Sequence, residues 1–134
     1  MTRAFDPAYG EAWTASQTLS ALSLPNSQLL IARDADQICG FAISRWVLDE
    51  EELLMIAVDP NHQGKGIATS LLEEIIANLL INNRKTLFLE VRDGNTAYNF
   101  YRNKGFNQIG RRKGYYSGNN MSYDAITMAL FFET

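Results

Sequence analysis

Apolar residues in the first half of the chain come in short runs that are separated by polar turns, a pattern typical of strands. Acidic or small residues at 34–36 and 49–52 predict the turns between them. Three consecutive antiparallel strands are therefore predicted at residues 28–33, 38–48 and 53–58. Before these strands, a capping residue followed by spaced apolar side chains predicts a helix over about residues 14–24.

The second half of the chain changes to a helical period. Asp59 and Pro60 end the third strand, and leucines and isoleucines then recur at spacings of three, four, seven and eight. This recurrence predicts a long amphipathic helix over about residues 66–81. The following pattern predicts a strand at 85–92, a short helix at 95–103, and two last strands at 106–113 and 125–132 joined by a polar segment at 115–123.

The order of these elements predicts an α+β fold with a mixed, mostly antiparallel sheet flanked by helices. The strands at 53–58 and 85–92 flank the long helix, so they should form a parallel crossover pair. A length of 134 residues and the absence of repeats or linkers predict one domain over residues 1–134.

Charge and composition narrow the function classes. The net charge is −3, with a pI near 5.1, which argues against nucleic acid or an anionic lipid surface as partner. No apolar stretch is long enough to span a bilayer, and no secretory leader opens the sequence, so a cytoplasmic location is expected. Cys39 is interpreted as a core thiol, and His62 has no neighbours at metal-ligand spacing, so no metal is expected.

The candidate chemistry begins where the third strand turns through Gly64, Lys65 and Gly66 directly into the long helix. The N–H groups at a helix start and the helix dipole attract anions, and glycines let a phosphate approach the backbone. The alternative interpretation is a tight turn without a ligand. The acidic run at 49–52 is also open to two interpretations, a polar hairpin turn or a contact surface for a basic peptide.

Around this turn, the segment V-D-P-N-H-Q-G-K-G-I-A resembles the acetyl-coenzyme A signature Q/R-x-x-G-x-G/A of the GNAT superfamily of N-acetyltransferases, with Gln63, Gly66 and Ala68 at its defining positions. Four later motifs resemble the ribosomal-protein-alanine N-acetyltransferase (RimI-like) branch of that superfamily. These motifs are L-E-V-R, Y-R-N-K-G-F, R-R-K-G-Y-Y and D-A-I-T-M.

The resemblance implies roles for individual residues. Glu90 would be the general base and Tyr101 the general acid toward the coenzyme A thiolate, although Glu90 could simply face outward and Tyr101 could be a core aromatic. Asn95 would bind the pantetheine, cap the following helix, or do both. The other implied cofactor contacts are Ile56, Ala57, Val58, Gln63, Gly64, Lys65, Gly66, Ile67, Ala68 and Thr69. The implied acceptor contacts are Arg112, Tyr115 and Tyr116.

The expected function is direct transfer of acetyl from acetyl-coenzyme A to the N-terminal amine of a protein, favouring a ribosomal protein, in a ternary complex. One alternative keeps the fold but uses a small amine or a lysine side chain as acceptor. Another is a non-catalytic coenzyme A-binding regulatory module. The sequence also departs from the family: the usual first strand is lacking or altered, and one extra residue stands between Arg112 and Tyr115.

Overall fold

The computed structural model describes residues 25–118 and 121–133, and for 116–118 and 121 only the backbone. The predicted helix over 14–24 and the altered first strand lie outside these residues. In chain order the described elements are β1 (Ser27–Asp34), β2 (Gln37–Val47), β3 (Glu50–Val58), the 3-10 turn η2 (Pro60–His62), α2 (Ile67–Ile81), β4 (Thr86–Arg92), α3 (Ala97–Asn103), β5 (Asn107–Gly118) and β6 (Met121–Phe131).

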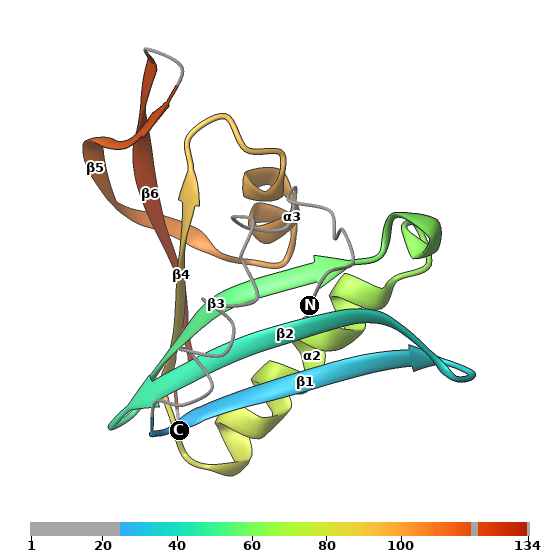
Figure 1. Cartoon of the computed structure of the whole chain (residues 1–134). Coiled ribbons are helices and arrows are strands. Elements are labelled where there is room, and N and C mark those ends of the chain that lie inside the picture. Colours follow the sequence, from blue (N-terminus) through green and yellow to red (C-terminus); the bar gives the residue numbers. More distant parts are fainter. Residues whose placement is uncertain (1–24, 119–120, 134) are drawn as a thin grey trace.

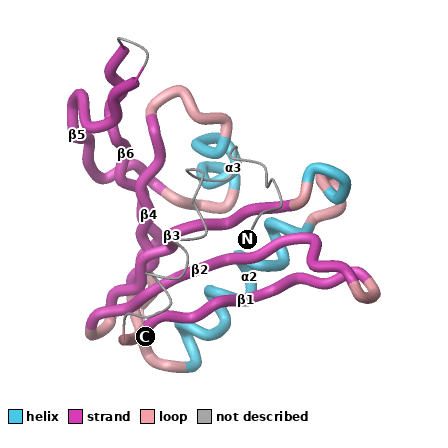
Figure 2. Tube along the Cα trace, in the orientation of Figure 1, coloured by secondary structure: helices cyan, strands magenta, loops and turns pink. Residues whose placement is uncertain are grey.

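The described strands form a single sheet with the order β1-β2-β3-β4-β6-β5 (Figures 1 and 2). Neighbouring strands are antiparallel except β3 and β4, which are parallel and are connected through α2. The predicted α+β class and the predicted crossover are therefore both confirmed.

The parallel pair β3–β4 holds together only at its beginning. Its register covers Glu50 with Thr86, Glu51 with Leu87 and Glu52 with Phe88, after which the two strands diverge (Figure 1). On its other side β3 stays paired with β2 as far as Val58. The register with β2 shifts beside Ile43, so that Leu54 has no counterpart, and such a bulge bends a strand. The bulge thus coincides with the start of the divergence.

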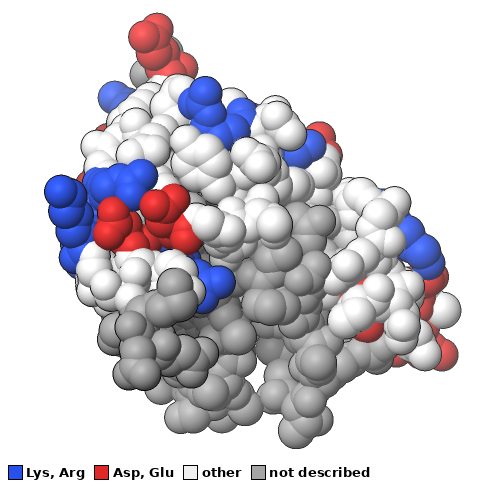
Figure 3. Space-filling view, turned by 90° about the horizontal axis from the view of Figure 1, so that it is seen from above, with Lys and Arg blue, Asp and Glu red and all other residues white. Residues whose placement is uncertain are grey.

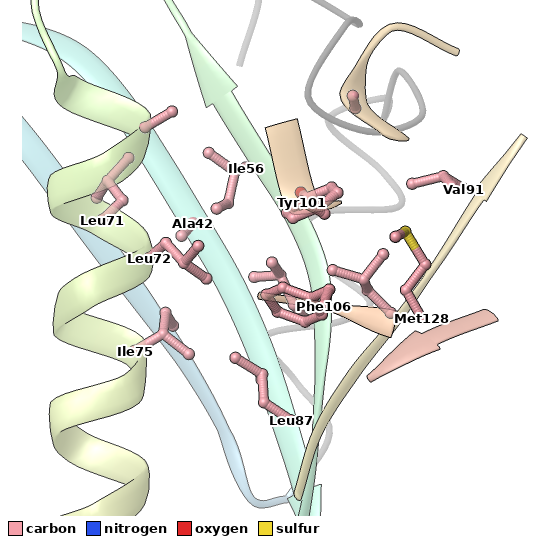
Figure 4. Packing of buried hydrophobic residues seen from close by; sticks show 14 of the residues in the cluster. Ala42, Ile56, Leu71, Leu72, Ile75, Leu87, Val91, Tyr101, Phe106 and Met128 are labelled. Atoms are coloured by element: carbon pink, nitrogen blue, oxygen red, sulfur yellow. The ribbon is translucent and has the colours of Figure 1, made fainter. Parts of the chain in front are cut away.

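The main core lies between the sheet and the helices. One face of α2, which includes Leu71, Leu72 and Ile75, points toward Ile56 and Leu87 of the sheet (Figure 4). Tyr101 of α3 and Phe106, which follows the helix, fill the same cluster. Fully burying a side chain of this size stabilises the fold by about 1.5–3 kcal/mol. A smaller cluster around Phe41, Ile43, Met55 and Ala57 covers the opposite face of the sheet.

The two α-helices of the described residues, α2 and α3, end in the same hydrogen-bonded motif. After α2, Asn83 adopts φ 60° and Arg84 N–H donates to Leu79 O at 3.0 Å. After α3, Gly105 adopts φ 98° and Phe106 N–H donates to Tyr101 O at 3.0 Å. This left-handed ending satisfies carbonyls of the last turn and fixes the direction of the chain that follows.

Two predicted boundaries are wrong. The run at 49–52 is not a turn, because Glu50, Glu51 and Glu52 belong to β3 and only Leu48 and Asp49 make the turn. The segment 115–123 is not a loop over most of its length, since β5 and β6 extend into it as a hairpin with backbone partners such as 116 with 123. In both places the ladder to a neighbouring strand overrides a polar local sequence.

Candidate functional site

The carboxyl end of β3 leads into a short, well-anchored loop. Asp59 N–H continues the ladder by donating to Cys39 O at 2.8 Å, and its carboxylate accepts a hydrogen bond from Asn61 N–H at 3.1 Å. His62 is buried in this loop, with Nε2 3.5 Å from Asp34 Oδ2 at the end of β1. These contacts fix the loop that precedes Gln63.

The next residues form a cradle at the start of α2. Gly64 and Gly66 have φ of 80° and 76°, the left-handed conformation that glycine adopts most readily, and a Cβ at either would meet no protein atom within 4 Å. The first helical bond runs from Ser70 N–H to Gly66 O, so the N–H groups before it have no partner within the helix. A cavity of about 80 Å³ lies here, lined by Val58, His62, Gln63, Gly64, Gly66, Ile67, Ala68, Thr69 and Phe100.

This cradle has the features of an anion site. No side chain caps the N-terminus of α2, and its first turn carries no acidic residue. The positive end of the helix dipole and the exposed N–H groups therefore favour a phosphate. Lys65 is exposed and does not line the cavity.

The diverging half of β3 presents peptide groups to the side that β4 has left. Because Asp59 bonds to Cys39 and antiparallel bonding alternates, Ala57 makes the ladder bonds to β2. The peptide groups of Ile56 and Val58 then point the other way, toward the space between β3 and β4. An extended ligand with amide groups would fit this edge, and the cradle lies at its end, so the described residues fit the pantetheine and pyrophosphate of coenzyme A.

Glu90 lies on the diverging part of β4, on the face of the sheet opposite to α2 and α3. Arg112 of β5 donates from Nη2 to Glu90 Oε2 at 2.5 Å, and the Arg112 guanidinium stacks 4.1 Å above the ring of Tyr115. The Glu90 side chain is 19% exposed and that of Arg112 is 59% exposed. The structure therefore brings together Glu90, Arg112 and Tyr115, three residues that the motifs singled out separately.

Tyr101 is buried, with 2% of its surface exposed. Its ring packs edge to face on Phe100 at 5.2 Å and on Phe106 at 5.4 Å, within the cluster that holds Ile56 and Val91 (Figure 4). Tyr101 is therefore a core aromatic, which was one of its two interpretations from the sequence. Its role as a general acid stays a prediction.

Two other predicted contacts have structural roles. The side chain of Asn95 accepts a hydrogen bond from Ala97 N–H at 2.9 Å and so satisfies the first N–H of α3 from just before the helix, while its contact with pantetheine stays a prediction. The extra residue between Arg112 and Tyr115 is absorbed by a register shift of β5 between Arg112 and Tyr116, beside Gly114 with φ 63°. The side chain of Tyr116 lies outside the described part of the chain.

Sequence reasoning missed two residues of the cradle. His62 precedes Gln63 but had been given no role, and only its burial beside the cavity reveals it. Phe100 lies on α3, more than thirty residues away along the chain, and nothing in the local sequence signals its contact with the loop. Both depend on tertiary packing.

Charges of both signs are intermingled on the surface shown in Figure 3, without a broad area of one sign among its described residues. Within residues 25–118 and 121–133, no three His, Cys, Asp or Glu side chains are grouped to hold a metal ion. No helix in the described part is long and apolar enough to span a membrane.

Comparison with known proteins places this fold and site in a class. The family described as "Acetyltransferase (GNAT) domain" matches residues 25–108. The chain belongs to the GNAT acetyltransferase family, as its motifs had predicted.

Within that family, the chain is similar to enzymes named [Ribosomal protein bS18]-alanine N-acetyltransferase. It is 44% identical to that of Haemophilus ducreyi over 100 residues, which are 73% of this chain and 69% of the relative. It is 43% identical to that of Escherichia coli over 95 residues, 70% of this chain, and thus spans just under two thirds, 64%, of that relative.

Solved structures agree. The crystal structure of the ribosomal-protein-S18-alanine N-acetyltransferase from Escherichia coli matches with a TM-score of 0.83 and 35% identity, covering 91% of this chain and 79% of that one. A GNAT family acetyltransferase from Elizabethkingia anophelis with acetyl-CoA bound shares the fold, with a TM-score of 0.76 at 21% identity, covering 89% of this chain and 84% of that one. The predicted GNAT fold and the predicted resemblance to the ribosomal-protein-alanine branch are both confirmed.

Proposed function

We propose that this protein transfers acetyl from acetyl-coenzyme A to the N-terminal amine of a protein, with a ribosomal protein as the favoured acceptor. Transfer is direct, within a ternary complex, and no covalent acetyl-enzyme forms. The relatives named above act on an alanine of ribosomal protein bS18, and this name supports the choice of acceptor.

One observation carries the proposal. β3 and β4 separate after Glu52 and Phe88, the phosphate cradle stands at the end of β3, and Glu90 stands on the separated part of β4. A donor molecule bound along β3, with its phosphates in the cradle, would place its acetyl group between β3 and β4, on the side where Glu90 stands. The similar fold with acetyl-CoA bound supports this choice of donor.

The chemistry required of the protein is modest. Bound acetyl-coenzyme A supplies an activated acyl group, and the acceptor amine must be neutral to attack it. An α-amino group has a reference pKa of about 7.7–8.0, so a weak base suffices at neutral pH, whereas lysine at about 10.4 needs a stronger one. Arg112 orients the Glu90 carboxylate until the amine is bound, and Glu90 then accepts the proton, directly or through water.

On the other side of the reaction, Tyr101 gives a proton to the departing sulfur. Its burial keeps bulk water away from the ring. The C–N bond forms as the C–S bond breaks. One proton has then moved from the amine to Glu90 and another from Tyr101 to the thiol.

The test is acetyl transfer to a panel of acceptors, with mass spectrometry locating each acetyl group. The panel holds peptides with free N-termini, the same peptides N-terminally blocked but containing lysine, and small polyamines. We expect modification of α-amines, strongest on basic peptides with a small first residue. Transfer only to lysines or polyamines would replace the acceptor, and coenzyme A binding without transfer to any amine would favour the regulatory module.

The cradle can be tested separately with Gly66→Val. The substitution places a branched side chain at a φ of 76°, where the Cβ meets no protein atom but would enter the space assigned to the phosphates. We expect a loss of acetyl-coenzyme A affinity of at least tenfold by calorimetry, while Gly114→Val, at φ 63° in the distant hairpin, retains affinity. Normal binding by a folded Gly66→Val variant would refute the cradle.

A further inference from the structure

Glu52 occupies a special place in the sheet. It is opposite Arg45 of β2 and opposite Phe88 of β4, in the last pair before β3 and β4 diverge. Side chains alternate along a strand, so Glu52 lies on the same face as Glu90, which stands two residues beyond Phe88. Glu51, its neighbour in sequence, points to the opposite face and into the core.

The surroundings of Glu52 form an open pocket. A cavity of about 310 Å³ is lined by Arg45, Val47, Glu50, Glu52 and Phe88. The Glu52 carboxylate is partly buried there, and it makes no hydrogen bond or ion pair with another residue of the described part of the chain. A partly buried carboxylate without such a partner is unfavourable unless something else neutralises or binds it.

The charges around Glu52 indicate what that occupant is. Burial raises the pKa of Glu52, Arg45 lowers it, the neighbouring charge of Glu90 raises it and Arg112 lowers it. The two carboxylates are therefore close enough to repel each other, and each has one arginine beside it, Arg45 opposite Glu52 and Arg112 in contact with Glu90. A cation placed between the carboxylates would relieve their repulsion.

We propose that Glu52 is a second carboxylate of the acceptor site and binds, together with Glu90, the ammonium group of the incoming N-terminus. This inference rests on the proposed function. An ammonium group has three N–H donors, so it can bond to both carboxylates at once. When the nitrogen loses its first proton to Glu90, an N–H bond breaks and an O–H bond forms, which relieves the repulsion between the carboxylates. Glu90 then passes this proton to water, so that it can accept the second proton that the nitrogen loses as the C–N bond forms.

The same arrangement distinguishes substrate from product. An acetylated N-terminus is a neutral amide with one N–H, so it gains little from two carboxylates. Glu52 should therefore strengthen binding of the free N-terminus and not of the acetylated one, which aids release of the product.

The experiment compares one basic peptide with its N-terminally acetylated form. Affinities are measured by calorimetry with coenzyme A present, for the unmodified protein, Glu52→Gln and the control Glu73→Gln, which is exposed on α2 and does not line the pocket. We expect Glu52→Gln to weaken binding of the free peptide by roughly tenfold and to leave the acetylated peptide and coenzyme A unchanged. Glu73→Gln should change neither peptide.

Kinetics provide a second readout. Glu52→Gln should raise KM for the free peptide more than it lowers kcat, and should change the pH dependence of kcat/KM, whereas Glu52→Asp should restore part of the affinity. Equal weakening of both peptides, a loss that depends on the second side chain of the peptide, or unchanged binding would overturn the inference. A wild-type protein that acetylates no N-terminus would refute the proposed function instead, because the binding comparison needs no turnover.

Discussion

Two glutamate–arginine pairs, on opposite faces of the same sheet, show how burial separates a structural charge from a chemical one. Glu51 and Arg84 lie 3.3 Å apart with side chains 0% and 10% exposed, and Glu51 also accepts hydrogen bonds from Ser44 at 2.6 Å and from Gln28 at 2.9 Å. Glu90 and Arg112 are in contact at 2.5 Å but are 19% and 59% exposed.

The difference lies in what each pair could still bind. The Glu51–Arg84 pair is enclosed, and Arg84 is also stacked 4.0 Å over Trp46, so neither partner can move without leaving a buried charge. Arg112 can move aside into water and expose Glu90 to a ligand. A carboxylate that performs chemistry needs such a replaceable partner, whereas Glu51, which joins three strands and the loop after α2, does not.

The sharpest test of this contrast is Glu90→Gln, because it keeps the shape and removes the base. We expect turnover to fall by roughly 10²- to 10⁴-fold with little change in acetyl-coenzyme A affinity. Steady-state kinetics and calorimetry measure the two quantities. Turnover close to that of the unmodified protein would remove Glu90 as the base.

The same substitution in the two arginines should separate stability from activity. Arg84→Met leaves Glu51 charged in the core and should lower the free energy of unfolding by about 3–5 kcal/mol. Arg112→Met should change that free energy by less than about 1 kcal/mol, since the arginine is exposed, but should alter turnover. Urea unfolding measures the stability of both variants, and kinetics measure their turnover. Equal losses of stability in the two variants would contradict the contrast.

A smaller effect is expected within the buried network. Ser44→Ala removes one hydrogen bond to Glu51 without removing the ion pair, so the free energy of unfolding should fall by about 1–3 kcal/mol. Ser70→Ala, on the exposed side of α2, should stay within about 0.5 kcal/mol of the unmodified protein. Equal stabilities in thermal or urea unfolding would show that the network does not depend on Ser44.

The smallest effect is expected for a third ion pair, Arg111 with Asp124, which is partly open to solvent. Arg111 and the Gly114 N–H both lower the pKa of Asp124 below its ordinary value of 3.8. A lowered carboxyl pKa stabilises the fold at neutral pH, and this contribution is lost as the pH falls below 3.8 and through the lower pKa of the folded state.

Hydrogen exchange can follow this loss locally. The Gly114 N–H, which donates to Asp124 at 3.0 Å, should lose protection on acidification, once the intrinsic pH dependence of exchange is divided out. Asp124→Asn should abolish that dependence while leaving the global unfolding transition nearly unchanged. Protection that does not depend on pH would show that the hairpin is held by its backbone ladder alone.

Much of the fold could be predicted because its signals are local. The spacing of Leu71, Leu72, Ile75 and Leu79 predicts α2 within one residue of its start, and Asp59-Pro60 marks the end of β3. The acidic start of β3 was not predictable in this way. Glu51 is acceptable inside a strand only because Ser44, Gln28 and Arg84 meet it, and they come from three separate parts of the chain.

The residues of the candidate site likewise fall into those that local motifs predict and those that only tertiary packing brings together. Glu90 and the glycine turn could be singled out because short motifs contain them. Glu52 could not, since a run of four acidic residues reads as a solvated turn, and its neighbours Arg45, Phe88 and Glu90 are brought together only by strand pairing. Phe100 and His62 likewise join the cradle only through packing.

The divergence of β3 from β4 also bears on association between molecules. An exposed sheet edge is a template on which another strand can add, and proteins usually block such edges. Here the edge offered by Ile56 and Val58 lies in the middle of the sheet, beside α3 and the core rather than at its rim. Another protein chain would have to enter between β3 and β4 to pair with this edge, so the interior edge is less open to strand addition than an edge at the rim of the sheet.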